Sequence, residues 1–515
     1  MHNLTASSPT LTIPTNASPS YPSSSSLPFP IRVQFTNSFK TQNSLSLNRN
    51  GYRLFSMIHR SKPTDSRNGF SRKLGVEDGG VEVYAGYGVG DGGEVEFEVG
   101  GGFAIGDRDI DRDIDIATLG NLCVDIVLNV PKLPPPEINE RKDYMDRLSA
   151  SPPDKRYWEA GGNCNTAIAA ARLGLKCVAI GHVGSEIYGN FLLDVLNDEG
   201  IGVVGMSGNL DAVDSAAAEY ETLLCWVLVD PQHRHGFCSR ADFSNEPAFS
   251  WMNALISDVK AAVQRTKVLF VNGYGFDELS PSLIVAALKH AVKVGTCVFF
   301  DPGPRGKSLS LGTPEQQSAL GDYLRMSDVI LLTSDEAEAL TGISDPILAG
   351  QELLRRSERA KWIAVKMGTK GSILISLSGV AYAPAFKVRV VDTVGCGDSF
   401  LAAIAYGFVH KMPKLHTLVL ANAVGAATAM GCGAGRNVAT LKQVVELIKA
   451  GDLIEDTESG KEILDKCTDV QEITLLSKMM VNGGVDRVNR LSFEDVAPEL
   501  LTRLKSVEVE EALPS

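Results

Sequence analysis

An aspartate and two glycines stand at the start of an alanine-rich, apolar stretch in the last quarter of the chain. They belong to the run Gly395-Cys396-Gly397-Asp398, and no Gly or Pro follows until Gly407. Such a stretch is typical of a buried helix, whose first turn we expect near Gly397 and Asp398. The free backbone N–H groups at the start of a helix attract anions, and phosphate above all.

Asp398 has two interpretations at the level of the local sequence. A carboxylate repels a bound phosphate, but it suits a general base that takes a proton from a hydroxyl group attacking that phosphate. The N–H groups of Gly395, Cys396 and Gly397 would then hold the developing negative charge. In the alternative interpretation the Gly-Cys-Gly turn only caps a helix, and Asp398 interacts favourably with the helix dipole.

The segments that must position this turn alternate between apolar strands and helices. Strands are expected at 267–273, 296–300, 329–332 and 362–366, with helical segments after the first three. This alternation predicts a parallel sheet with helices on both faces. Ligands of such a sheet bind at the carboxyl ends of its strands, where the polar motifs of this sequence fall.

A second group of polar residues lies earlier in the chain and suits an alcohol ligand. Asp125 stands alone near the end of the apolar strand 116–127, and Gly161, Gly162 and Asn165 follow in the run 160–167. Glycines let the backbone approach a ligand closely, and an Asn amide both donates hydrogen bonds to a polyol and accepts them from it.

These two groups together resemble the ribokinase-like (pfkB) carbohydrate kinases. The run Asp392-Thr393-Val394-Gly395-Cys396-Gly397-Asp398 looks like the C-terminal signature of that family, and 160–167 looks like its N-terminal signature. The resemblance covers roughly residues 115–450. It implies an α/β, ribokinase-like domain at 116–450, with a central, mostly parallel sheet, helices on both faces and a small β-lid. It also implies ATP-dependent transfer of a phosphoryl group to a hydroxymethyl group of a sugar, a polyol or a nucleoside.

The resemblance carries roles over to individual positions. Asp398 would be the catalytic base, assisted by the N–H groups of residues 395–397. The other implied ligands are, for the substrate, Asp125, Gly161, Gly162, Asn165 and Arg240, and for ATP, Thr393, Gly368, Gly371 and Asn422.

The resemblance also implies that two cations bind. Glu336 would hold a Mg²⁺-bound water, and Asp392 would bind a monovalent cation such as K⁺ together with backbone carbonyls of the loop 431–437. Arg436 lies within that loop. Its positive charge is a candidate to replace or exclude K⁺.

The sequence departs from the family pattern at four positions. Cys123 replaces an Asn that ribokinases carry, Gly303 replaces an Asn, Thr333 replaces the Asn of the Asn-x-x-Glu motif, and Cys396 replaces Ala, Gly or Ser. Ribose is therefore a doubtful substrate. Cys396 is interpreted as a small side chain tolerated in a tight turn, or alternatively as a thiol of lowered pKa.

A second function class stays open. Some plastid relatives are fructokinase-like scaffolds of the gene-expression apparatus, and the departures at Gly303, Thr333 and Cys396 would suit such a catalytically weak or inactive protein. Asp398 argues against it, because a scaffold has no need of a base in a phosphate-binding turn. A Rossmann dehydrogenase is excluded, because no Gly-x-Gly-x-x-Gly follows the first strand.

The first 73 residues have the composition of a plastid transit peptide. They hold nine Lys and Arg but only one acidic residue, Asp65, and they are rich in Ser. A mitochondrial presequence is the alternative. Residues 74–115 are rich in Gly and acids and are expected to form a flexible linker. Residues 451–515 form an acidic C-terminal extension, expected to be a peripheral helix or a mobile tail.

Composition limits the partners. Without residues 1–73 the chain keeps 40 basic against 61 acidic residues, so we expect no direct nucleic-acid binding. No apolar run reaches the roughly 18 residues that span a bilayer. Nine scattered cysteines without a Cys-x-x-Cys pair favour a reducing compartment, here the plastid stroma. A small-molecule substrate is the expected partner, with a homodimer and plastid gene-expression proteins as further candidates.

Overall fold

The computed structural model describes residues 112–151, 153–205, 221–232, 234–243, 251–454, 462, 466, 472–477 and 488–511. The side chains of 240, 241, 477 and 506–511 are not among the described ones. The predicted transit peptide (1–73) and most of the predicted linker (74–115) therefore lie outside the described residues. Described structure begins just before the first strand, which starts at Ile114.

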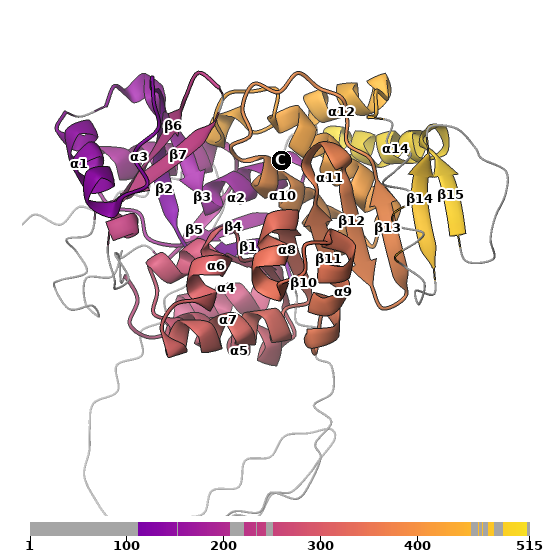
Figure 1. Cartoon of the computed structure of the whole chain (residues 1–515), viewed down its shortest axis with the longest axis horizontal. Helices are drawn as coiled ribbons and strands as arrows, with labels where there is room; N and C mark the ends of the chain where they lie inside the picture. Colours follow the sequence, from indigo (N-terminus) through magenta and orange to yellow (C-terminus); the bar gives the residue numbers. More distant parts are fainter. Residues whose placement is uncertain are drawn as a thin grey trace, which may run out of the picture. The chain divides into compact units, whose positions relative to one another are not determined.

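A large sheet runs through the middle of the described fold (Figure 1). Its strands follow the order β15-β14-β13-β12-β11-β10-β9-β8-β1-β4-β5, and neighbours are parallel except β11–β12 and β12–β13. Their bounds are β1 (Ile114–Leu119), β4 (Cys177–Ile180), β5 (Gly202–Val204), β8 (Thr266–Asn272), β9 (Cys297–Asp301), β10 (Val329–Thr333), β11 (Trp362–Lys366), β12 (Ser372–Ser376) and β13 (Gly379–Ala383), with β14 (Ile473–Ser477) and β15 (Val488–Ser492) at one edge. The predicted parallel core is confirmed.

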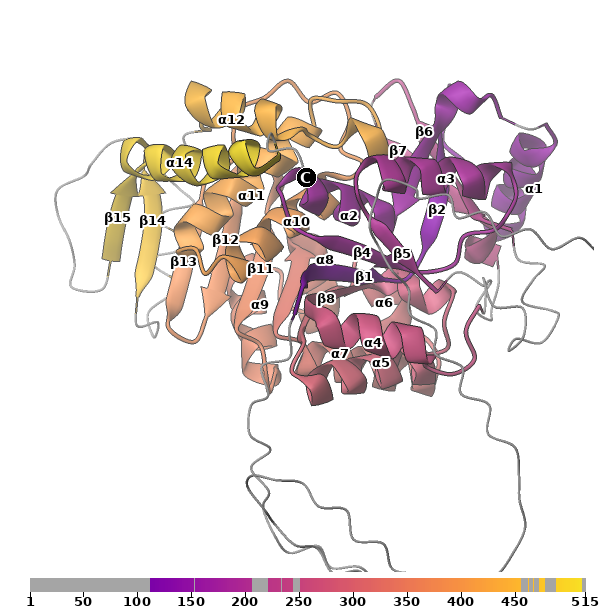
Figure 2. The same cartoon turned by 180° about the vertical axis from the view of Figure 1, so that it is seen from behind.

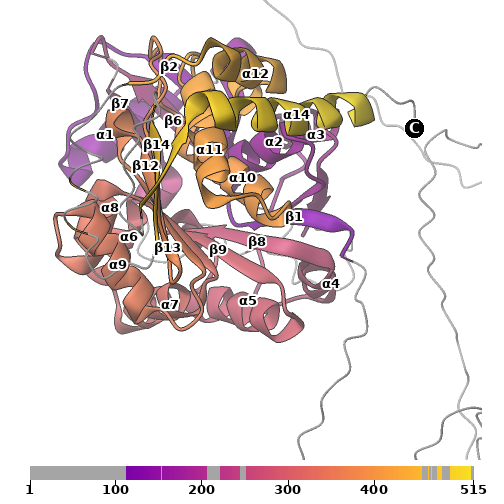
Figure 3. The ribbon, with the colours of Figure 1, turned by 90° about the vertical axis from the view of Figure 1, so that its right-hand side faces the viewer.

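Helices cover both faces of this sheet, as the view in Figure 3 shows. One face carries α4 (Ser257–Arg265), α5 (Pro281–Val294), α6 (Arg305–Ser310), α7 (Pro314–Met326), α8 (Ser334–Thr341) and α9 (Pro346–Arg356). The other carries α2 (Asn163–Arg172), α10 (Cys396–Val409), α11 (Lys414–Thr428), α12 (Leu441–Ala450) and α14 (Phe493–Glu511). The central strands are apolar without alternation because both of their faces are buried against these helices.

A separate four-stranded sheet forms the lid. Its order is β3-β2-β6-β7, from β2 (Leu122–Asn129), β3 (Trp158–Gly162), β6 (Leu223–Val229) and β7 (His235–Ser239). The lid strand predicted at 223–229 is confirmed. The charged stretch 139–158, also assigned to the lid, is mostly the helix α1 (Ile138–Ser149), which lies beside the lid sheet with α3 (Ile187–Asp198) (Figure 1).

The C-terminal extension is more integrated than the sequence suggested. Strand β14 pairs in parallel with β13, and β15 pairs in parallel with β14. Figure 2 shows α14 running from the end of β15 beside α11 and α12, and Leu500 and Leu504 are buried in the same hydrophobic cluster as α10 and α11. The expected helix is present as α14, but the strands β14 and β15 were not predicted, because long-range parallel pairing leaves no local signal in the sequence.

Within the part of the chain that the structure describes, no helix is both long enough and apolar enough to cross a membrane.

Candidate active site

The start of α10 forms the predicted phosphate-binding turn. The helix begins at Cys396, and its N-cap Gly395 has a φ of 75°, in the left-handed region. A Cβ at Gly395 would stand 2.7 Å from the Cβ of Ala434. Glycine is therefore required here for its backbone angle and for the close approach of the loop 431–437. The helix and its glycine turn were predicted correctly.

Asp398 lies in the first turn of α10 and is held from α2. Asn165 donates from Nδ2 to Oδ2 of Asp398 at 3.4 Å, and Thr166 donates from Oγ1 to Oδ1 at 3.3 Å. Burial and the charge of Asp301 raise the pKa of Asp398 to about 6, although Lys366 and these two hydrogen bonds work in the opposite direction. A carboxylate with this pKa is ionised at neutral pH and can accept a proton.

A lysine that the sequence analysis did not select stands at the same helix end. Lys366 closes β11, and its Nζ donates to Oδ2 of Asp301 at 2.9 Å. A Cβ at Gly397 would lie 3.4 Å from this Nζ, so the ammonium group is next to the turn. Together with the N–H groups of α10 it makes a positively charged cradle that suits a phosphate.

Two carboxylates face this lysine and are suited to a hard divalent cation. Asp301 ends β9, and Glu336 lies in the first turn of α8. Burial and the charge of Asp301 raise the pKa of Glu336, while Lys366 opposes the shift. In the described residues no group of three or more His, Cys, Asp or Glu is gathered for a metal. Mg²⁺ is commonly bound by one or two carboxylates plus substrate phosphates, so this donor set fits a nucleotide-borne Mg²⁺.

Thr333, the departure from the family pattern, has a structural role. Its Oγ1 accepts from the N–H of Glu336 at 3.2 Å, and Glu336 accepts from the N–H of Thr333 at 2.7 Å. This capping box holds Glu336 at the carboxyl end of β10. The substitution therefore keeps the carboxylate in place.

A cavity of about 620 Å³ opens beside the turn. Thr393, Gly368, Gly371 and Asn422, the predicted ATP residues, all line it, together with Lys366 and Gly397 at its polar end. Its other walls are largely apolar and come from Ala385, Phe386, Val388, Val390, Ala421, Ala426, Ala429 and Ile454. A polar end at a helix N-terminus and an apolar wall match the phosphates and the base of a nucleotide.

Asn422 shapes this cavity rather than offering its amide to it. Its Nδ2 donates to the carbonyls of Ala383 and Pro384, both at 3.0 Å, and its Oδ1 accepts from Ser372 Oγ at 2.8 Å. The side chain thus ties α11 to β12 and to the end of β13.

Asp125, Gly161 and Asn165, three of the residues predicted to bind the alcohol, lie near Asp398 or near one another. Asp125 is buried on β2, and Gly161 lies on the paired strand β3, across from Cys123. A Cβ at Gly161 would meet the Asp125 carboxyl group at 2.2 Å, and Gly162 has a φ of 59°. Burial raises the pKa of Asp125 to about 7, with a further rise from the charges of Asp398 and Glu159 and a decrease from the Cys123 thiol. The glycines are needed where the lid strand passes this carboxyl group.

Asn165 has a different place from the one expected. Besides its bond to Asp398, its Oδ1 accepts from the N–H of Gly435 at 2.8 Å. The side chain therefore joins the base to the loop 431–437. It positions Asp398, a role that the sequence analysis did not assign to it.

Asp392 does not have the surroundings of a cation ligand. Its Oδ1 accepts from the N–H of Val394 at 3.0 Å, and its Oδ2 accepts from the N–H of Gly433 at 2.6 Å. Nε2 of His235, from the lid strand β7, forms an ion pair with Oδ1 without the alignment of an ordinary hydrogen bond. Burial by itself would raise the pKa of Asp392, but His235 and the two N–H groups lower it to about 2. Both oxygens are already engaged by protein donors, which does not fit a bound K⁺.

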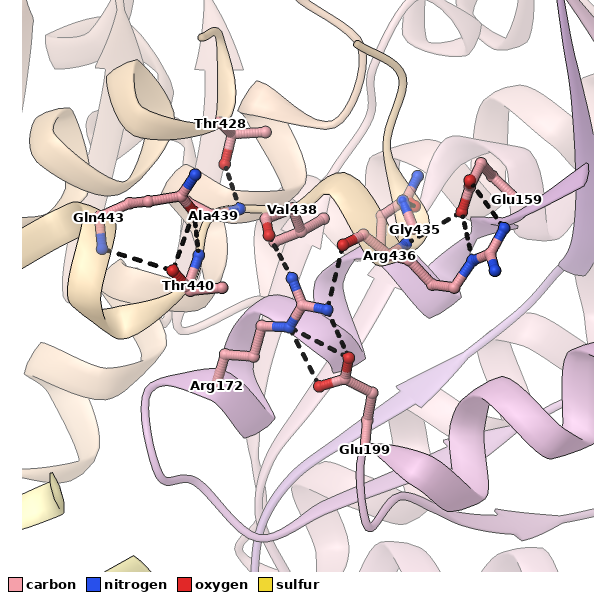
Figure 4. Close-up of polar contacts among 11 residues, drawn as sticks. Glu159, Arg172, Glu199, Thr428, Gly435, Arg436, Val438, Ala439, Thr440 and Gln443 are labelled. Atoms are coloured by element: carbon pink, nitrogen blue, oxygen red, sulfur yellow. Dashed lines mark hydrogen bonds and ion pairs between the residues drawn. The ribbon is translucent and has the colours of Figure 1, made fainter. Parts of the chain in front are cut away.

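Arg436, the expected substitute for K⁺, points elsewhere. Figure 4 shows its guanidinium turned towards Glu159, with Nε and Nη2 each 3.0 Å from a carboxylate oxygen. Arg172 holds the same loop by donating to the carbonyls of Arg436 and Val438 and to Glu199 (Figure 4). The prediction that Arg436 occupies the cation position is wrong, because its long side chain finds a carboxylate on β3 instead.

Two further expectations concerned the thiol of Cys396 and the substrate contact of Arg240. Burial, with the nearby charges of Asp392 and Asp398, raises the pKa of the Cys396 thiol to about 12. The alternative of a low-pKa thiol is thus wrong, since burial and then the two carboxylates disfavour the thiolate. The backbone of Arg240 follows β7 in a short 3-10 turn, but its side chain lies outside the described residues.

Four described residues of the site were missed: Thr166, His235, Asp301 and Lys366. Lys366 had a sequence signal, because a charged residue closes an otherwise apolar strand just before a glycine turn. Thr166 follows Asn165 directly and was not considered as a partner of the base. His235 was not assigned a role, because its contact with Asp392 joins residues from two distant parts of the chain.

A comparison with known protein families decides the family. The model of the pfkB family of carbohydrate kinases matches residues 114–441. The chain belongs to this family.

Similar proteins act on several sugars. The chain is 26% identical over 313 residues to 5-dehydro-2-deoxygluconokinase of Bacillus thuringiensis (59% of this chain and 85% of the relative). It is 26% identical over 301 residues to fructokinase-1 of Oryza sativa (56% and 88%) and 27% identical over 254 residues to mouse ribokinase (48% and 70%). Because these three identities are nearly equal, they do not indicate which sugar is the substrate of this chain.

Solved structures share the fold. An E. coli protein assigned as ribokinase II, in complex with ATP and Mg²⁺, matches with a TM-score of 0.53 at 20% identity, over 65% of this chain and 99% of that one. A fructokinase of Xylella fastidiosa with bound ATP matches with a TM-score of 0.50 at 22% identity, over 65% and 99%. The ribokinase-like fold inferred from the sequence is confirmed.

Proposed function

We propose that this protein transfers the γ-phosphoryl group of ATP to a hydroxymethyl group of a sugar, a polyol or a nucleoside. One observation carries the proposal: a carboxylate with a pKa of about 6, Asp398, stands at the start of α10 between a nucleotide-sized cavity and the buried Asp125. Such a base next to a phosphate-binding helix end serves phosphoryl transfer to an alcohol.

The residues of this chain divide the reaction between them. Asp125 orients the alcohol, and Asp398 accepts the proton of its hydroxymethyl group. The alcohol oxygen forms the new bond to the γ-phosphorus while the bond from that phosphorus to the β,γ-bridging oxygen breaks. Lys366 and the N–H groups at the start of α10 stabilise the negative charge that develops on the phosphoryl oxygens.

Mg²⁺ is the cation that Asp301 and Glu336 would hold, and it neutralises charge on the β- and γ-phosphates when it is bound with ATP. The E. coli relative solved with ATP and Mg²⁺ supports this pairing. We leave K⁺ out of the proposed cofactors, because both oxygens of Asp392 already have protein partners.

The test is ATP consumption in the presence of Mg²⁺ with a panel of sugars, sugar acids, polyols and nucleosides. We expect turnover with one class of alcohol, and Asp398→Asn is expected to lower kcat by about 10²–10⁴-fold, the range for loss of general base catalysis. ATP binding, measured by calorimetry, should survive the substitution, since Asp398 makes its hydrogen bonds to α2. Absence of turnover with every alcohol, although ATP binds, would overturn the kinase proposal in favour of the plastid scaffold.

We also propose a location in plastids. Its support is the composition of residues 1–73, which are rich in Ser and nearly free of acids. A fluorescent fusion of residues 1–80 should enter chloroplasts, and a cytosolic or mitochondrial signal would contradict the proposal. Dimerisation through the lid and contacts with gene-expression proteins stay predictions of the family resemblance, open to light scattering and co-purification.

A further inference from the structure

The contact between His235 and Asp392 joins the lid to the phosphate-binding turn. His235 opens β7, where it pairs with Val229 of β6, and its side chain is 12% exposed. Asp392 lies just before the turn 393–397 and is 2% exposed. The ion pair thus lies in the interior, at the junction between a lid strand and the loop that leads into α10.

Protein donors already engage both carboxylate oxygens of Asp392. Its carboxylate faces three donors: His235 and the N–H groups of Val394 and Gly433. The carbonyls of Ala434 and Gly435 are used within their own turn, where they accept the N–H groups at positions 437 and 438. A cation needs several free oxygen ligands. An imidazolium group, or the positive end of an N–H group, at the same carboxylate would repel the cation.

No other cationic side chain of the loop takes this place. Arg436 is paired with Glu159 and donates to the carbonyl of Trp158 (Figure 4). Its guanidinium also lies over the ring of Phe191, 5.3 Å from the ring centroid. The side chain that meets Asp392 therefore comes from the lid and not from the loop.

We propose that His235 takes the place of a monovalent cation at Asp392, so that this kinase works without K⁺. His235 is a positioning residue, because it contacts neither the nucleotide cavity nor Asp398. Its N–H edge balances the Asp392 carboxylate and holds the turn 393–397 in the geometry that offers its N–H groups to phosphate. Since His235 belongs to β7, the turn reaches this geometry only when the lid strand is in place.

The experiment compares the full chain in K⁺ and in tetramethylammonium chloride at equal ionic strength, which keeps general screening constant. For the wild type we expect turnover to change less than about twofold and the Tm to be the same in both salts, whereas allosteric coupling to a bound effector typically changes affinity about 5-fold or more. Activation of the wild type by K⁺ at that level, or a K⁺-dependent rise in its Tm, would overturn the proposal.

The variant His235→Ala tests whether loss of the imidazole makes the enzyme depend on K⁺. Without K⁺ the variant should lose at least about tenfold in turnover, K⁺ should restore most of it, and K⁺ should raise its Tm, since a ligand that binds only the folded state stabilises it. His235→Gln keeps an N–H donor and should remain independent of K⁺. A His235→Ala protein that is fully active without K⁺, or whose loss K⁺ does not restore, would contradict the proposed role.

Arg436→Ala is the matched control, because it removes a positive charge from the same loop without touching Asp392. The turnover and the Tm of this variant should be the same with and without K⁺. The turnover arm rests on the proposed kinase function, but the Tm arm does not. If no alcohol were phosphorylated, the Tm of the wild type and of His235→Ala in K⁺ would still decide whether His235 occupies the cation position.

Discussion

The protonation of Asp398 reflects a balance between neighbours of opposite charge. Burial and Asp301 favour the neutral acid, while Lys366 and two hydrogen bonds from α2 favour the carboxylate. The balance leaves the pKa at about 6, so that the base is ready at neutral pH and is lost in mild acid. The same residue would be a poorer base in water, where the pKa of Asp has its ordinary value of 3.8.

This balance predicts the pH dependence of turnover. Only the ionised form of Asp398 accepts a proton, so kcat should fall as the pH decreases through about 6, by about tenfold per unit below it. Lys366→Met removes the cation that lowers this pKa and should move the midpoint upward, in addition to weakening ATP binding. The measurement is kcat between about pH 5 and pH 8.5. Lys307→Met, an exposed lysine on α6, is the control, and a midpoint that Lys366→Met leaves unmoved would contradict this account.

Glu278 is a buried acid that the reaction does not use, and it makes a prediction about stability. It is 3% exposed, and burial raises its pKa from 4.5 to about 8. Between these pH values the folded chain binds a proton that the unfolded chain has released, so the free energy of unfolding decreases as the pH rises. This loss is complete once the pH exceeds about 8.

Glu278→Gln should therefore gain stability relative to the wild type as the pH rises from about 5 to about 8.5, because the amide cannot ionise. Urea midpoints at several pH values measure the difference. Glu338→Gln, an exposed position on α8, should show no such trend. A constant difference between Glu278→Gln and the wild type across this range would show that Glu278 is ionised in the folded state.

At the scale of elements, the turn depends on how closely α10 and α11 pack. Gly407 on α10 faces Thr417 on α11, and a Cβ at Gly407 would stand 2.3 Å from Thr417 Oγ1. The two helices can approach this closely only because position 407 has no side chain. Their packing sets the direction of α10 and, with it, the place of Asp398.

Gly407→Ala should accordingly destabilise the protein by about 1–3 kcal/mol, the range for overpacking in a core, and should lower turnover by displacing α10. Gly321→Ala is the matched control. Gly321 lies in α7 with no atom near the place of an added Cβ, so the substitution should stabilise by about 0.5–1 kcal/mol through helix propensity. Denaturant titrations of both variants test the pair, and a stabilised Gly407→Ala would mean that the helices separate at no cost.

At the scale of the whole described fold, the C-terminal strands and α14 are one body with the kinase core. Strand β14 extends the sheet beyond β13, and Ile454 from the segment after α12 lines the nucleotide cavity. The ion pair of His416 on α11 with Glu499 on α14 adds a polar contact at 3.0 Å. The residues beyond the family match at 441 thus complete the body that carries the ATP site.

The substitution Leu500→Ala tests whether the C-terminal extension and the kinase core unfold together. Leu500 is fully buried in α14 against the cluster that includes α10 and α11, and truncation of such a leucine costs about 2–5 kcal/mol. We expect the denaturation midpoint of the whole kinase body to fall in a single transition, followed by fluorescence and by ATP binding together. Lys505→Ala, exposed on the same helix, should leave the midpoint unchanged. An early separate transition with intact ATP binding would show that the extension unfolds independently.

What the sequence by itself determined was local. The helix after the glycine turn, the strand positions of the core and both family signatures lie in continuous stretches, where hydrophobic period and glycine placement carry the information. The residues of the ATP cavity could be predicted through the family resemblance, because each belongs to a short motif. The C-terminal strands could not, since a parallel pair leaves no turn between its partners.

What only the tertiary structure decided was the use of each polar group. Asn165 meets Asp398 across 233 residues of sequence, and Lys366 meets Asp301 across 65. Lid and loop likewise meet at His235 and Asp392, while Arg436 turns away to Glu159. A buried polar side chain takes the partner that packing places within reach, and that choice depends on the relative positions of whole elements, which no local pattern of residue types records.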